Sequence, residues 1–184
     1  MKATKLVSLA IPILLLVGCA VGDKEAIPKT EQTSKAMLKT VISEKQYPYY
    51  ICEQLVEFQF KKDGILLKLG EASKDNKRYK DVLKTANDMD EALDRMENIK
   101  VPDKYKDIHK LVLEGVTDAR KGTKIIKDAN KEDGLKIQEA VLKSAPHMSG
   151  VDGDQWREAI YKLNQETKDA YAKALDKQME EHTK

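Results

Sequence analysis

The residue with the clearest chemical potential is Cys19, a thiol that follows a short apolar segment near the N-terminus. Lys2 and Lys5 give a positive start, residues 6–17 form an apolar core, and Gly18 places a small side chain before the thiol. This order is typical of an export signal. The core is shorter than the roughly 20 apolar residues that a membrane-spanning helix needs. The sequence therefore predicts a signal peptide that ends at Gly18.

The segment Leu16-Val17-Gly18-Cys19 resembles the lipobox of bacterial lipoproteins, in which an aliphatic residue, a small or β-branched residue and Gly or Ala precede a cysteine. The resemblance implies that Cys19 receives a diacylglycerol on its sulfur and becomes the first residue of the mature chain. Two or more acyl chains anchor a protein stably, whereas one does so only marginally. We therefore expect a lipid-anchored protein on the outer face of the cell membrane. An ordinary secretory signal and a plain membrane anchor are the alternatives.

Other chemistry-bearing residues form no recognisable site. His109, His147 and His182 are far apart and match no zinc-binding spacing. Asp152-Gly153-Asp154 lacks the further oxygen ligands of an EF-hand, so we interpret it as a turn in which Asp154 caps a helix. Glycine-rich phosphate loops and nucleophile motifs are not recognisable. We expect no metal, no cofactor and no catalytic residue.

The charge balance narrows the class of partner. The formal net charge of +2 comes from Lys2 and Lys5 of the signal, so the mature chain carries equal numbers of basic and acidic side chains. This balance gives no electrostatic reason to expect nucleic acid or anionic lipid as a partner. Once Cys19 is acylated, Cys52 is the one remaining thiol, so no disulfide can form within the chain. Cys52 lies in an apolar stretch and is expected to pack as a small hydrophobe.

Behind Cys19 we expect a tether over residues 19–33 and a helical domain over residues 34–184. The tether contains Pro28, charges and threonines without apolar periodicity. The domain shows apolar residues at three- and four-residue steps, and no segment alternates with period two long enough for a strand. The predicted helices run from Ser34 to Tyr47, over residues 49–73, from Tyr79 to near Lys100, from Pro102 to about Asn130, around Ile137 to Leu142, and from Asp154 onward.

These helices predict an all-α fold. Their short connections favour antiparallel neighbours, and hence an up-and-down bundle of about four long helices with one or two shorter pieces. In the final helix, apolar residues from Trp156 through Leu163 to Ala174 follow a nearly heptad spacing. We expect this seam to pack within the monomer, and a seam for a partner chain is the alternative.

Aromatic residues concentrate in residues 47–60, which hold five of the ten in the chain. One side of a helix cannot bury all of them. The sequence therefore predicts a patch that faces a partner, made of Tyr47, Tyr49, Tyr50 and Phe60. The alternative is that the short first helix covers them.

A second candidate site is a pocket between helices near Tyr105, His109 and Trp156. Tyr105 and His109 are four residues apart, on the same side of their predicted helix. Such a pocket would make the protein a ligand-binding module. The alternative is that His109 is a partly buried ring that packs the start of the helix.

The segment around Pro102, Tyr105 and His109 also resembles small helical lipoproteins of Gram-positive bacilli, over roughly residues 49–130. The resemblance implies a surface-anchored helical domain and supplies no catalytic residue. We therefore expect a non-enzymatic interaction or scaffold protein that meets a protein partner at the membrane. The alternatives are a surface lipoprotein that binds a small ligand, and an exclusion lipoprotein of phage or plasmid type.

Overall fold

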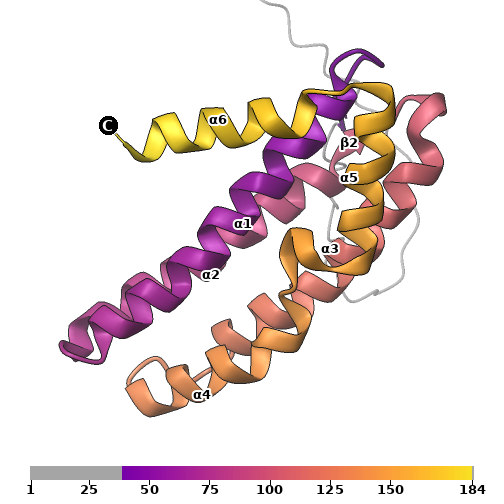
Figure 1. The fold of residues 1–184 in the computed structure, drawn as a ribbon. Helices are drawn as coiled ribbons and strands as arrows, with labels where there is room; N and C mark the ends of the chain where they lie inside the picture. Colours follow the sequence, from indigo (N-terminus) through magenta and orange to yellow (C-terminus); the bar gives the residue numbers. More distant parts are fainter. Residues whose placement is uncertain (1–38, 184) are drawn as a thin grey trace, which may run out of the picture. The chain divides into compact units, whose positions relative to one another are not determined.

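The computed structural model describes residues 39–183, and these are almost entirely helical, which confirms the predicted all-α fold (Figure 1). The predicted signal peptide, the lipid-attachment residue Cys19 and the tether over residues 19–33 lie outside the described residues. The α-helices are α1 (Tyr47–Ala72), α2 (Tyr79–Glu97), α3 (Lys106–Lys127), α4 (Gly134–Ser144), α5 (Asp154–Glu166) and α6 (Ala170–His182).

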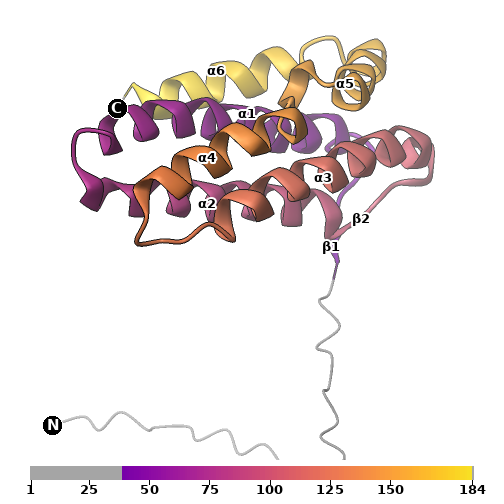
Figure 2. The same cartoon turned by 90° about the horizontal axis from the view of Figure 1, so that it is seen from below.

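Consecutive helices from α1 to α4 run antiparallel, as the up-and-down prediction requires. In Figures 1 and 2, α1 lies beside α2, α2 beside α3, and α3 beside α4, while α5 packs on α3 and α6 returns over α1. Apolar faces of these helices meet in one core. Its fully buried large side chains include Ile51, Leu55, Phe58, Ile65, Met89, Leu93, Ile126 and Leu163.

The chain before α1 differs from the prediction. Instead of a helix that ends at Tyr47 because Pro48 breaks it, the described part of this segment contains β1 (Thr40–Val41), which pairs in parallel with β2 (Ile99–Lys100). Pro48 is the second residue of α1, a position where its missing N–H leaves no hydrogen bond unmade. Strands of two residues are too short to leave an alternating pattern in the sequence.

The middle of the bundle follows the predicted order, with shorter helices. Pro102 is extended, and a 3-10 turn over Asp103–Tyr105 precedes α3. The 22 residues of α3 make a helix about 33 Å long that ends at Lys127, before the predicted end at Asn130. A side-chain cap at Asp133, which accepts hydrogen bonds from the backbone N–H groups of Leu135 and Lys136, then starts α4.

The predicted final helix is in fact two helices, α5 and α6. Thr167 has an extended backbone (φ −146°, ψ 91°), and its N–H bonds to the carbonyl of Leu163, which ends α5. Thr167 and Asp169 both have low helix propensity, which favours a break at this point. Trp156, Leu163 and Ala174 are all buried within the monomer, so the seam packs inside the chain although the helix carrying it is broken.

The helix start at Asp154 also differs from the prediction. Gly153 occupies the N-cap position without a side-chain hydrogen bond, and Asp154 is the first residue of α5. The Asp154 carboxylate accepts a hydrogen bond from Arg157 instead of from the backbone. Asp154 therefore complements the positive end of the helix dipole without capping it.

Candidate functional site

Tyr47, Tyr105 and His109 form a buried cluster where the start of α1 meets the start of α3. The rings of Tyr47 and Tyr105 stack with centroids 4.6 Å apart. The Tyr47 hydroxyl and Nδ1 of His109 form a hydrogen bond of 2.9 Å. Tyr47 is fully buried, and His109 is only 5% exposed. Tyr47 therefore belongs to the core and cannot face a partner, which corrects its place in the predicted patch.

The same cluster corrects the predicted pocket. Tyr47 fills the space beside Tyr105 and His109, so these two side chains form packed contacts and not the lining of a ligand site. Burial, reinforced by the positive charge of Lys39, lowers the pKa of His109 to about 4. The imidazole is therefore neutral at physiological pH, as the packing interpretation of His109 requires.

Trp156, the third predicted pocket residue, lies against other partners. Its Nε1–H donates a hydrogen bond of 2.9 Å to the carbonyl of Val112 in α3. Its ring meets Phe58 of α1 edge to face, with centroids 5.0 Å apart. Gly115 in α3 makes room for it, because a Cβ at that position would lie 2.3 Å from Nε1. The indole is therefore the packing centre of α1, α3 and α5.

A small cavity of about 160 Å³ beside Trp156 is lined by His147 and Asp118, which form the one histidine–carboxylate pair among residues 39–183. Nδ1 of His147 lies 3.0 Å from Oδ1 of Asp118. Burial opposes ionisation of Asp118, but hydrogen bonds from His147 and Lys121 outweigh it and lower its pKa. Ser149 lines the same cavity, yet among the described residues no hydrogen bond joins it to His147. The His147–Asp118 pair therefore does not activate Ser149 as a nucleophile in this arrangement.

The remaining residues of the predicted aromatic patch are half-buried and contact their own chain. The Tyr49 hydroxyl donates to Asp169, and the Tyr50 hydroxyl donates to the carbonyl of Arg95. Phe60 stacks on His182 near the end of α6, with centroids 5.2 Å apart. These aromatic side chains are covered by α6 and α2. The alternative prediction, that a short helix before Tyr47 covers them, therefore named the wrong element.

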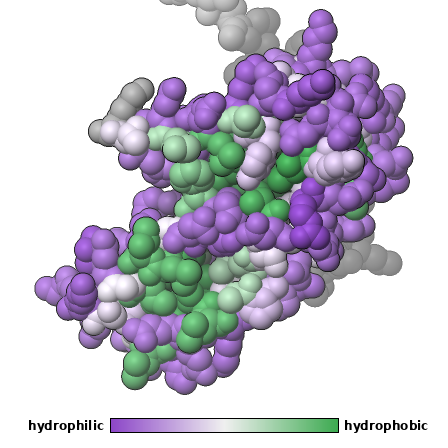
Figure 3. Space-filling view, in the orientation of Figure 1, coloured by the Kyte–Doolittle hydropathy of each residue, from purple (hydrophilic) through white to green (hydrophobic). Residues whose placement is uncertain are grey.

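Exposed large apolar side chains occur on several helices, including Tyr161 on α5 and Met179 on α6. Figure 3 shows two apolar areas on this side of the molecule, and one of them lies over the C-terminal part of α1 and over α4. Leu66 is 62% exposed, Leu135 75% and Leu142 70%. We call these three residues the leucine face. Ile65, the neighbour of Leu66 in the sequence, is buried.

On α1, contacts of neighbouring residues show which way Leu66 points. Gln59 lies seven residues earlier, and therefore on the same side of the helix. Its side chain accepts a hydrogen bond from the N–H of Val151, in the segment that joins α4 to α5. Leu67, which is 74% exposed, lies seven residues after Phe60 and therefore on the α6 side. Leu66 faces the α4 side of α1, and its neighbour Leu67 does not.

On α4, Leu135 and Leu142 are seven residues apart and share one side of the helix, about 10 Å apart along its axis. Gln138, between them, donates a hydrogen bond of 2.8 Å to the Tyr79 hydroxyl of α2. This side of α4 therefore borders the α1–α2 pair. A spacing of seven residues outside the buried stripe of Ile137 and Val141 was the sequence signal that could have predicted this face.

A metal site requires clustered ligands, and a membrane-spanning helix requires a long apolar segment. Within residues 39–183, no three His, Cys, Asp or Glu side chains are placed to hold a metal ion. In the same range, no helix combines the length and the apolar character needed to cross a membrane. Cys52 is buried as predicted, and burial raises the pKa of its thiol to about 12, which leaves it unreactive.

Comparisons of the chain with protein-family models, with curated proteins and with solved structures find no match.

Proposed function

We propose that this protein is a non-enzymatic, lipid-anchored docking module on the outer face of a bacterial cytoplasmic membrane, and that its leucine face binds a partner protein. The carrying observation is the exposure of Leu66 on the α4 side of α1 and of Leu135 and Leu142 on one side of α4. Exposed apolar surface of this kind is a feature of interaction sites. The lipobox-like segment ending at Cys19 supports the location.

The chemistry of the leucine face favours an amphipathic helix as the bound segment. Leucines two turns apart match the spacing of apolar anchors on such a helix. The charged neighbours on α4 are paired with one another, because Lys136 and Lys143 share Glu139, which leaves one net positive charge. The face therefore offers apolar contact with little net charge, and affinity would depend on burying leucine side chains.

Replacing Leu66 by glutamine should weaken partner binding about tenfold or more, because burying one leucine contributes about 1.5 to 3 kcal/mol. The partner is first captured by a photo-cross-linker at position 142 on intact cells, and its affinity for the purified protein is then measured. Leu67→Gln is the matched control, since it makes the same change on the α6 side of the same helix. Equal weakening by both variants, or by neither, would contradict the proposal.

Leu66→Gln and Leu67→Gln should each change the free energy of unfolding by less than about 0.5 kcal/mol, because both side chains are exposed. Melting temperature is measured for each variant before binding. Weaker binding by Leu66→Gln is attributed to a lost contact only when the variant has the same melting temperature as the unaltered protein. This requirement separates a lost contact from a lost fold.

Replacing Cys19 by serine should abolish lipid attachment completely, since a hydroxyl lacks the sulfur that carries the diacylglycerol. Cells are fed a labelled fatty acid, and both label and protein mass are measured. We expect loss of the label and retention of the first 18 residues. A variant that keeps the label, or that is cut behind Gly18 and still stays with the membrane, would refute anchoring at this residue.

A further inference from the structure

Four lysines, three on α2 and α3 and one after α3, line one cleft between these helices. Lys80 and Lys84 belong to the start of α2, Lys127 ends α3, and Lys131 follows it. Leu83 and Asn87 complete the lining of a cavity of about 260 Å³, which contains no carboxylate. The overall charge balance of the sequence thus conceals a local excess of positive charge that the antiparallel packing of α2 and α3 assembles.

Part of this charge is available for a ligand. Lys84 pairs with Asp88 at 2.8 Å, and Lys127 pairs with Asp90. Lys80 and Lys131 have no carboxylate within ion-pair distance among residues 39–183. Asp81 and Glu91, outside the lining, also act on Lys84. The charge left for a ligand is therefore that of Lys80 and Lys131. An anion that enters the cleft gains two ammonium groups without breaking an ion pair.

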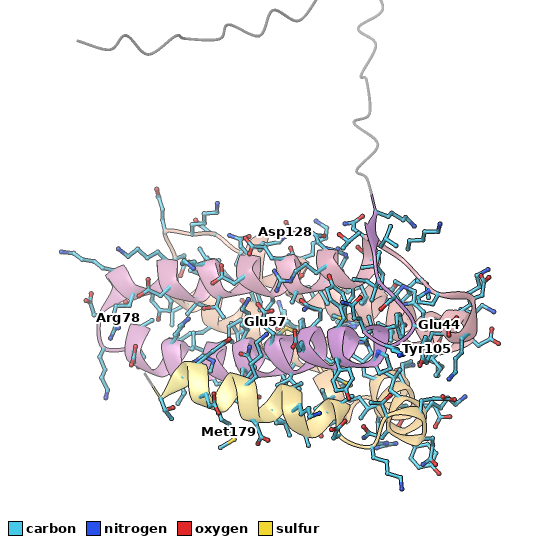
Figure 4. The ribbon with its side chains drawn as sticks, turned by 90° about the horizontal axis from the view of Figure 1, so that it is seen from above. Glu44, Glu57, Arg78, Tyr105, Asp128 and Met179 are labelled. Carbon is cyan, nitrogen blue, oxygen red and sulfur yellow. The ribbon has the colours of Figure 1, made fainter. Side chains whose placement is uncertain are left out.

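The cleft shares an edge of the bundle with the point where the chain enters the described domain. The Thr40 N–H donates a hydrogen bond of 3.0 Å to the carbonyl of Asn98, directly after α2. Figure 2 shows β1 and β2 at the α2–α3 edge, and Figure 4 shows Asp128 at that edge, opposite Met179 on α6. The 19 residues of α2 span about 28 Å. The lysines and the entering chain therefore mark the two ends of one edge.

We propose that the α2–α3 edge rests on the membrane and that the lysine cleft binds phosphate groups of anionic phospholipids. This rests on the proposed anchoring of the chain through its N-terminus, which enters at that edge. Lysine ammonium groups are compact donors suited to phosphate. Each lysine near an anionic bilayer surface strengthens association about fivefold. The leucine face, between α1 and α4, stays uncovered in this orientation and open to a partner protein.

The test measures how fast individual lysines react when the full chain is held on vesicles. The protein is reconstituted on vesicles of phosphatidylcholine alone or with one part in three phosphatidylglycerol, and a soluble amine-reactive reagent is added. Mass spectrometry gives the rate at each lysine. Lys45 and Lys168 are matched controls, because they are exposed and, like Lys80 and Lys131, lack an ion-pair partner among the described residues.

We expect Lys80 and Lys131 to react about fivefold more slowly on the phosphatidylglycerol vesicles, with no change at Lys45 and Lys168. High salt should remove the protection by screening the charges. Equal rates at all four lysines on both vesicles would overturn the proposal. Protection on phosphatidylcholine vesicles by added inorganic phosphate, without protection by phosphatidylglycerol, would also overturn it, in favour of a soluble phosphate ligand.

This result is separable from failure of the proposed function. The mass of the N-terminal peptide in the same digest shows whether Cys19 is acylated. The assay requires only that the chain be held on vesicles, by acyl groups or by its apolar run over residues 6–17. Slower reaction of Lys80 and Lys131 without acylation of Cys19 would support phosphate binding by the cleft and refute the lipid anchor. Acylation of Cys19 without slower reaction of these lysines would support the anchor and refute phosphate binding by the cleft.

Discussion

Trp156→Ala should lower the free energy of unfolding by about 3 to 5 kcal/mol, as expected for removal of a buried tryptophan from a well-packed core. The indole is 2% exposed, contacts Phe58 edge to face, and donates its N–H to the carbonyl of Val112. Alanine would leave a cavity where α1, α3 and α5 meet. Urea unfolding followed by circular dichroism measures the loss, because the variant lacks the one tryptophan of the chain.

Gly115→Ala tests the same contact from the opposite side. The added Cβ would lie 2.3 Å from Nε1 of Trp156, a distance that forces the ring or the helix to move. Overpacking of this kind costs about 1 to 3 kcal/mol. In a Trp156→Phe background the smaller ring should relieve most of that cost, so the two substitutions should be non-additive. Additive losses, or a loss below about 1 kcal/mol for Trp156→Ala, would show that the indole does not organise this junction.

The second large effect is an acid-dependent loss of stability at His109. Burial lowers the pKa of His109 to about 4 in the folded protein, whereas an unfolded histidine titrates near about 6.5. Between these values the unfolded chain binds the extra proton. Stability is therefore complete above about pH 6.5, falls as the pH drops toward 4, and loses about 3 kcal/mol in total.

The variant His109→Asn separates the contribution of His109 from that of carboxylate protonation, which also destabilises proteins in acid. Asparagine retains an acceptor near the Nδ1 position for the Tyr47 hydroxyl and does not titrate. We expect the variant to be less stable at pH 7 and to show a shallower fall between pH 6.5 and 4.5. Tyr47→Phe should keep the steep fall, because burial and not the hydrogen bond lowers the pKa. Parallel stability curves for His109→Asn and the unaltered protein would contradict this assignment.

The sequence predicted helices wherever an apolar stripe was long. The periodicity of residues 49–73 and of the stripe beginning at Tyr79 matches α1 and α2 closely, because a three- and four-residue repeat is a property of the chain alone. Pro48 was misinterpreted because proline interrupts a helix interior but is favoured in its first turn. The sequence around it does not distinguish the two positions.

Which side chains meet across the bundle depended on tertiary structure. Periodicity predicts the side of a helix that is buried, but it contains no information about the neighbour that covers that side. Tyr47 therefore appeared as an exposed candidate and is a buried partner of His109, more than 60 positions away. For the same reason, periodicity could not predict that Leu142 is exposed and that Ile65 is buried.

The sequence by itself determined the helical class, the order of α1 to α4, and the lipobox-like segment that predicts the protein's location, since these depend on local spacing. The tertiary structure alone decided the leucine face and the lysine cleft. Lys80 and Lys131 are 51 positions apart in a chain of balanced charge, and they line one cleft because α2 and α3 pack antiparallel. A local pattern cannot encode such a surface, because its residues become neighbours only when the helices pack.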